Sequence, residues 1–215
     1  MSSSVERKRV RKSPEARRAE IVETATSVAL TEGLECVTLR RIAEELTVRP
    51  GLISHYFPVV EDLVAEAFGS AAIAELEALL PADRAQGTAD DWLARFFARA
   101  TGPAYDDISR LWINARHLSR YRPTLRDRVG EQEAAWRGRL EELIREGVAE
   151  GRFRTPDPYV TAIQILVVLD GLGAHANTDT SGRPGAVTLM AVTTAERELG
   201  LTPGALVAAV ARAAD

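Results

Sequence analysis

The sequence predicts an all-α fold in which a small N-terminal three-helix unit precedes a larger helical domain. Two observations carry this prediction. Alanine is abundant whereas runs of β-branched residues are short, and apolar residues recur at helical spacing between proline and glycine breaks. At 215 residues, of which 46% are hydrophobic and 27% charged, the chain is long enough to bury a core.

The first helix is predicted to begin at Pro14, after a disordered basic arm of residues 1–13. Ser13 suits the N-cap, Pro14 suits the first helical position, and Glu15 lies in the positively charged first turn. Gly33 is expected to end this helix. Its buried face is expected to comprise Ile21, Ala25, Val28 and Ala29.

Residues 38–63 predict a helix, a tight turn, a second short helix and the start of a third. Thr38 is the expected N-cap of the first of these helices, and Pro50 suits the first position of the second. Ile53 and Phe57 are four residues apart and are expected to pack inward. The apolar face of the first helix comprises Leu39, Ile42, Ala43 and Leu46.

The outward face of the second short helix carries arginine, serine, histidine and tyrosine, which suits a DNA major groove. Arg49 is expected to bind a guanine edge or a phosphate, and Gly51 lets the backbone approach DNA closely. At least one of Arg40 and Arg41 is expected to face the DNA backbone; the alternative is a solvated helix face. The candidate DNA-binding residues are Thr38, Arg40, Arg49, Pro50, Gly51, Ser54, His55 and Tyr56.

The charge distribution also bears on DNA binding, although the net charge is −4. Residues 1–18 carry seven basic and two acidic residues, a net charge of +5. Residues 1–57 have a net charge of +2, and the rest of the chain has −6. A basic arm before an acidic body is consistent with DNA contact by the arm, with a solubilising tail as the alternative.

Residues 38–63 resemble the helix-turn-helix of TetR-family transcriptional regulators, and the resemblance extends to the preceding helix from about Arg17. The run ISHYF is similar to the branch that includes the choline-responsive BetI repressors. The segments EGRFR and LVVLDGLG resemble the ligand-binding domain of that branch. The matching residues are Thr38, Leu39, Arg40, Ile42, Ala43, Val48, Gly51, Ile53, Phe57, Glu61, Asp62 and Leu63.

The chain departs from the family pattern at three positions. Thr47 stands where the family usually has a turn glycine, and Arg49 stands where a Ser or Thr cap is common. Val60 replaces a lysine that reaches a DNA phosphate in many members. Ser54 occupies a place where many members have tyrosine. These departures concern the DNA contacts rather than the fold.

The remaining elements are predicted from the same signals. A fourth helix follows Phe57, runs to about Leu80 and joins the DNA-binding unit (14–60) to the C-terminal domain (61–215). Thr88 is an expected cap, and Thr202 caps a last helix with Pro203 at its first position. Further helices are predicted at 90–100, 104–119, 124–150, 156–176, 186–199 and 203–214.

The helix at 156–176 is apolar over too much of its circumference for a surface helix. A homodimer, which the family resemblance implies, would cover that face; the alternative is a central core helix in a monomer. The sequence shows no 18-residue apolar span and no apolar signal segment, so no membrane association is expected. A single cysteine, Cys36, argues against a disulfide within the chain and fits a cytoplasmic setting.

A small-molecule effector is expected in the C-terminal domain. An aromatic wall together with Asp170 suits a cation, which agrees with the choline-responsive branch. The alternatives are that the aromatics form core and that Asp170 caps a helix or pairs across a dimer. The candidate ligand-binding residues are Trp92, Phe96, Trp112, Asn114, His117 and Asp170.

Enzymatic motifs are absent from the sequence: there is no GxSxG, no Walker loop and no HExxH. The histidines at 55, 117 and 175 have no metal-ligand spacing. No catalytic residue, metal or cofactor is expected. The leading hypothesis is a dimeric, ligand-responsive repressor that binds a palindromic operator. Its rivals are a DNA-binding protein without a sensor role and a protein-interaction module that does not bind DNA.

Overall fold

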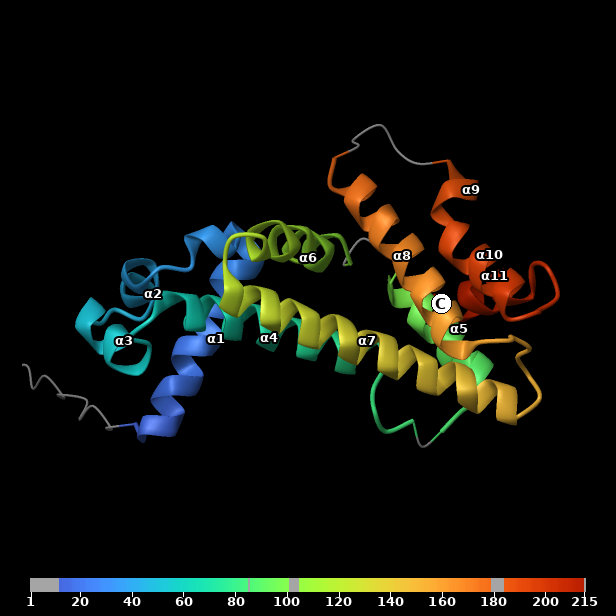
Figure 1. Cartoon of the computed structure of the whole chain (residues 1–215), viewed down its shortest axis with the longest axis horizontal. Coiled ribbons are helices and arrows are strands. Elements are labelled where there is room, and N and C mark those ends of the chain that lie inside the picture. Colours follow the sequence, from blue (N-terminus) through green and yellow to red (C-terminus); the bar gives the residue numbers. More distant parts are fainter. Residues whose placement is uncertain (1–11, 85, 101–104, 179–183, 215) are drawn as a thin grey trace, which may run out of the picture.

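The structure is a computed structural model, which describes residues 12–84, 86–100, 105–178 and 184–214. Within these ranges every regular element is a helix, as the sequence predicts. Figure 1 shows an elongated molecule with α1, α2 and α3 at one end and α5, α8, α10 and α11 at the other. The helices α4, α6 and α7 run between the two ends.

The N-terminal unit has the predicted caps and core. Its first helix, α1 (Pro14–Glu32), is capped by Ser13, whose Oγ accepts a hydrogen bond from the Ala16 amide at 3.2 Å. Gly33, at φ 100°, ends it. The four predicted stripe residues of α1 are buried. A 3-10 turn, α2 and α3 follow at Leu34–Cys36, Leu39–Glu45 and Pro50–Tyr56.

The turn between α2 and α3 passes through a left-handed residue. Thr47 has φ 54°, and it is the one non-glycine residue with positive φ in the described part of the chain. A β-branched side chain in this conformation costs about 1–2 kcal/mol. The family preference for glycine at this position therefore has a direct steric reason.

Replacement of Thr47 by glycine is expected to stabilise the protein by about 0.5–1 kcal/mol. The variant loses the steric cost of the left-handed conformation but gains some entropy in the unfolded chain. Denaturant unfolding at fixed protein concentration measures the change. Thr31→Gly, in the last turns of α1, is the matched control and should be destabilising. A loss of stability in Thr47→Gly similar to that control would contradict the strain at this turn.

Three long helices connect the two ends of the molecule: α4 (Val60–Leu79), α6 (Tyr105–Ser119) and α7 (Pro123–Ala149). Helix α4 packs against α1 and α7 along its length. Pro123 begins α7, because its missing N–H costs nothing at a first helical position. The helix predicted at 124–150 is therefore correct to within one residue at each end.

The EGRFR segment closes α7 with a tight contact. Gly151 has φ 72°, and the Phe153 amide donates back to the Gly147 carbonyl at 3.0 Å. The Phe153 ring is buried against Gly147, so that a Cβ there would lie 2.1 Å from the ring. Only glycine allows this ring to lie against the helix.

The described residues of the C-terminal end form five helices, and the last of them differ from the prediction. The predicted helix at 186–199 is divided at Leu189. The last helix begins two residues later than predicted, and Thr202 is not its side-chain cap. Instead the buried Glu196 carboxylate accepts hydrogen bonds from the Leu206 and Val207 amides at 2.8 and 3.1 Å. The five helices are α5 (Ala89–Ala100), α8 (Pro158–Ala176), α9 (Gly185–Thr188), α10 (Met190–Glu198) and α11 (Ala205–Ala214).

Helix α8 corrects the expectation that no apolar span of membrane-crossing length exists. In the described ranges it is the one helix with the length and composition of such a span. An 18-residue window of this helix has a mean hydropathy of 1.4. Core helices of soluble proteins pass the same test. Only 33% of the window is buried. The residues of its exposed stripe, which lie three and four apart, are Val160, Gln164, Val167, Gly171 and Ala174.

Candidate DNA interface and ligand cavity

Helix α3 is held by its inward face and leaves the opposite face open. Ile53 is fully buried, and Phe57 is 2% exposed. Arg49, the N-cap with extended backbone, precedes two exposed residues, Pro50 and Gly51. No atom lies within 4 Å of where a Gly51 Cβ would be. The start of α3 therefore gives another molecule access to the backbone and to the arginine.

The remaining side chains of α3 divide between surface and core. Ser54 donates to the Gly51 carbonyl at 3.3 Å, and His55 is exposed. The His55 ring meets the edge of the Tyr56 ring with centroids 5.3 Å apart. Tyr56 is half-buried and packs against the core, so it also supports the helix.

The start of α2 places Arg40 and Arg41 in different surroundings. Thr38 is the N-cap, and its Oγ1 accepts from the Arg41 amide at 3.1 Å. The Arg41 guanidinium is held by Glu32 at 2.6 Å and by Glu45 at 2.7 Å, and the hydrogen bonds to these carboxylates raise its pKa. Arg40 also pairs with a carboxylate, that of Glu44 at 2.8 Å, but its side chain is 84% exposed. Arg40 is therefore the more accessible of the two cations.

Most of the predicted basic arm lies outside the described residues. Of the arm's cations, the described Lys12 pairs with Glu20 at 2.7 Å. Arg18, in α1, stacks over the Phe57 ring at 4.8 Å and pairs with Glu66 of α4. Arg18 thus fixes α1 to the end of α3 and to α4.

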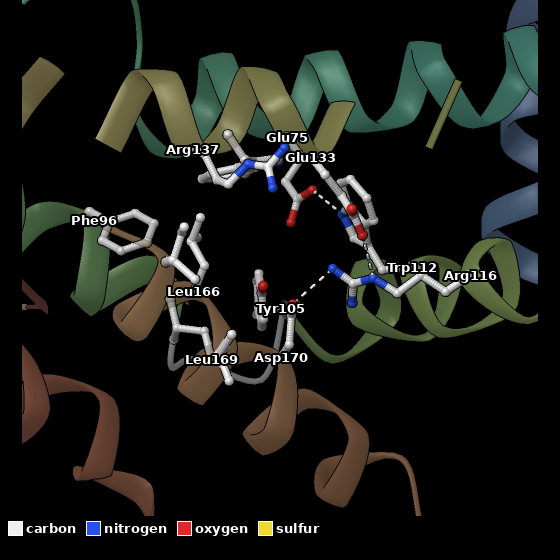
Figure 2. A pocket seen from close by; sticks show the side chains of 13 residues that line it. Glu75, Phe96, Tyr105, Trp112, Arg116, Glu133, Arg137, Leu166, Leu169 and Asp170 are labelled. Carbon is white, nitrogen blue, oxygen red and sulfur yellow. Dashed lines mark hydrogen bonds and ion pairs between the residues drawn. The ribbon is translucent and has the colours of Figure 1, made fainter. Parts of the chain in front are cut away.

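A cavity of about 190 Å³ lies in the C-terminal part of the molecule, between five helices. Helix α4 supplies Glu75, and α5 supplies Phe96 (Figure 2). Three of the predicted ligand-binding residues, Phe96, Trp112 and Asp170, line it. Its lining residues from α6, α7 and α8 are Tyr105, Trp112, Arg116, Glu133, Trp136, Arg137, Ile163, Leu166, Val167, Leu169 and Asp170.

Charged groups in the cavity form a connected network. Arg116 donates to Glu133 at 3.0 Å and to Asp170 at 2.8 Å, and its guanidinium lies 5.1 Å from the centre of the Trp112 ring. Figure 2 shows Arg116 reaching across to Asp170 on the opposite helix. Burial raises the pKa of Asp170, and Arg116 opposes that rise. The Trp112 indole donates to Glu75 at 2.7 Å.

Comparisons with known proteins match both parts of the chain. Residues 21–67 match the family of bacterial regulatory proteins of the tetR type. Residues 81–200, more than half of the chain, match the C-terminal domain of BetI-type transcriptional repressors. The chain belongs to the TetR family of transcriptional regulators, in its BetI-like group. The comparison with curated proteins gave no match.

Solved TetR-like structures have the same fold over nearly the whole chain. A protein from Rhodococcus sp. described as a TetR-family regulator is 20% identical, with a TM-score of 0.71, and the match covers 86% of this chain and 99% of that one. A regulator from Pseudomonas aeruginosa PAO1 is 23% identical, with a TM-score of 0.70 and coverage of 94% and 96%. A regulator from Saccharomonospora viridis in complex with choline is 25% identical, with a TM-score of 0.68 and coverage of 84% and 94%.

Membership of the TetR family explains the general arrangement: a helix-turn-helix DNA-binding unit, and a C-terminal domain. The family and fold are those of transcriptional regulators rather than enzymes. Helix α3 is the second helix of the helix-turn-helix. The predicted DNA-facing residues lie at the N-cap of α2, in α2, in α3 and in the turn between them.

Three predicted ligand residues of this TetR-family protein, Trp92, Asn114 and His117, do not line the cavity. Trp112 and Arg116 face the cavity because they are four apart on α6, and the helical period turns Asn114 and His117 elsewhere. His117 is exposed, with its ring 6.0 Å from that of Tyr121. Trp92 lies under Arg95, with the guanidinium 4.9 Å from its ring.

Asn114 instead joins α6 to the DNA-binding unit. Its Oδ1 accepts from the Leu34 amide at 2.8 Å, and its Nδ2 donates to the Glu35 carboxylate at 2.8 Å. The helix that forms one wall of the cavity is therefore fixed to the 3-10 turn before α2.

Glu75 is the cavity residue that sequence reasoning missed most clearly. The buried positions in this part of α4 are Ala71, Ala72, Glu75, Leu76 and Leu79, which follow helical spacing. A glutamate at an otherwise apolar, buried position needs a partner or a purpose. That signal was available in the sequence.

Proposed function

We propose that this protein is a dimeric, ligand-responsive repressor that binds a palindromic operator and releases it when a small cation enters the cavity. The choline complex of the Saccharomonospora viridis regulator supports a cationic effector. So does the cavity lining, with three carboxylates, two guanidinium groups and four aromatic rings. The setting of such a regulator is cytoplasmic.

The observation that carries this proposal is the span of α4. This helix begins three residues after Phe57, at the end of α3, and its last turns carry Glu75 into the cavity wall. A ligand that changes the position of α4 at one end therefore moves the DNA-binding unit at the other. A difference in ligand affinity between the two positions would shift the population between DNA-binding and released forms.

The DNA contacts are assigned to residues 14–60, with the basic arm of residues 1–13 as an additional contact. Arg49 would contact a base or a phosphate, while Thr38, Arg40 and His55 would contact phosphates. Pro50, Gly51, Ser54 and Tyr56 complete the surface.

Residues 61–215 are assigned to ligand binding and dimerisation. The exposed stripe of α8 is the proposed dimer surface, because a second copy would remove its apolar residues from water. Two copies related by a twofold axis would read half-sites about one helical turn apart.

Arg49→Ala is expected to weaken binding to the operator. Loss of a base contact costs about 1–3 kcal/mol and relaxes specificity, whereas loss of a phosphate contact weakens all sequences alike and flattens the salt dependence. Fluorescence polarisation with DNA from upstream of the gene, at several salt concentrations, measures both effects. Arg145→Ala, an exposed arginine of α7, is the control and should bind like the wild type.

The rival functions give different results in the same experiment. Weak binding that is equal on all fragments and unaffected by Arg49→Ala would favour a protein-interaction module. Tight binding to one fragment that no tested ammonium compound reduces would favour a DNA-binding protein without a sensor role.

A further inference from the structure

Glu75 is a buried carboxylate with half of its hydrogen-bonding capacity unused. Its side chain is buried, and Oε2 accepts the indole hydrogen of Trp112 at 2.7 Å. The other oxygen, Oε1, accepts no hydrogen bond of ordinary geometry from any residue that the structure describes, although Trp136 faces the same carboxylate. A buried acceptor without a donor is costly, so this oxygen is suited to a group that enters the cavity.

The neighbouring charges leave Glu75 without a dedicated cation. Arg116 of α6 is already engaged by Glu133 and Asp170. Arg137 of α7 lines the same cavity but forms no ion pair with Glu75 among the residues that the structure describes, and Arg116 is the cation whose charge acts on the pKa of Glu75. Tyr105 of α6 is a neutral neighbour, because burial raises the pKa of its phenol. Phe96, from α5, adds no charge.

The Glu75 carboxyl keeps its proton up to near neutral pH. Burial raises the pKa of its carboxyl to about 7, the negative charge of Asp170 adds to the rise, and the Trp112 indole and Arg116 oppose it. At pH 6 the empty cavity therefore holds a neutral carboxylic acid, and at pH 8 it holds a carboxylate.

We propose that Glu75 is the counterion of the effector, and that a cation entering the cavity displaces the proton from this carboxyl. The proton passes to solvent, and the positive charge of the ligand takes its place between the rings of Trp112, Trp136 and Tyr105. The inference rests on the proposed effector site but adds that the sensor measures a cation in competition with protons. Asp170, already paired with Arg116, is not the main counterion.

Proton competition sets the expected pH dependence. Choline should bind the wild type about tenfold more weakly at pH 6 than at pH 8. Nearly one proton should be released per choline at pH 6, and only about 0.1 at pH 8. Its uncharged analogue 3,3-dimethylbutan-1-ol should bind more weakly than choline at pH 8, with an affinity that does not change with pH.

Titration calorimetry at both pH values, in two buffers of different ionisation enthalpy, tests the proposal on the full chain. Glu75→Gln should lose both the proton release and at least tenfold of the preference for choline over the analogue. Glu75→Asp should keep part of the proton release, which shows that the charge is responsible. Glu131→Gln, on the exposed side of α7, is the matched control. Circular dichroism confirms that each variant is folded.

Three results would overturn the assignment. These are choline binding that is independent of pH in the wild type, binding that is unchanged in Glu75→Gln, and no binding of choline or tetramethylammonium at all. Operator binding is measured separately by fluorescence polarisation. A protein that binds its operator but shows pH-independent choline binding, or unchanged binding in Glu75→Gln, keeps the proposed cation-responsive function and lacks the proton-coupled counterion. A protein that binds its operator but neither choline nor tetramethylammonium lacks the cationic effector site as well.

Discussion

Gly171→Arg is expected to convert the protein into a monomer and to lower its affinity for operator DNA at least a hundredfold. Gly171 belongs to the exposed stripe of α8, with no atom within 4 Å of where its Cβ would be. Arginine therefore fits in the single chain. In the proposed dimer its charge would be buried without a partner, at a cost of several kcal/mol. A hundredfold corresponds to about 2.8 kcal/mol.

Light scattering after size exclusion measures the oligomeric state, and fluorescence polarisation measures operator binding. Gly130→Arg is the matched control, because Gly130 is also an exposed mid-helix glycine with open space around it. Both substitutions replace glycine within a helix, so neither should destabilise the fold. If Gly171→Arg remains a dimer, the dimer surface lies elsewhere on the chain.

The helix-turn-helix was predictable because its signals are local. Thr38 caps α2 through its own side chain, and Pro50 begins α3, both as expected from residue type. The strain at Thr47 has a local cause as well. Thr47 stands where the family usually has glycine, and it is the residue with positive φ. Each of these features depends on residues a few positions apart.

The ligand cavity was only partly predictable because five helices build it. Residue type identified Phe96, Trp112 and Asp170, but helical phase turned Asn114 away from the cavity and toward Leu34. Phase relative to a distant helix depends on packing rather than on local sequence. The cap of the last helix was missed for the same reason, because Glu196 belongs to another helix.

Glu75→Gln is expected to stabilise the protein at high pH relative to the wild type. The pKa of Glu75 is about 7 in the fold and about 4.3 in the unfolded chain. Between these values the folded state holds more protons, so the wild type loses stability as the pH rises toward 7. Glutamine has nearly the same shape as glutamate, but its side chain does not titrate. Its stability relative to the wild type should therefore rise by about 2–3 kcal/mol between pH 5 and pH 8.

Denaturant unfolding at pH 5 and pH 8 measures this difference, at one protein concentration because the proposed dimer makes stability depend on it. Glu131→Gln, an exposed pair with Arg128, should follow the wild type at both pH values. Parallel pH profiles for wild type and Glu75→Gln would mean that water or a relaxed cavity solvates the carboxylate. A divergence of the expected size would show that an empty cavity disfavours the charge of Glu75. A cationic ligand would then restore the stability that the wild type loses at high pH.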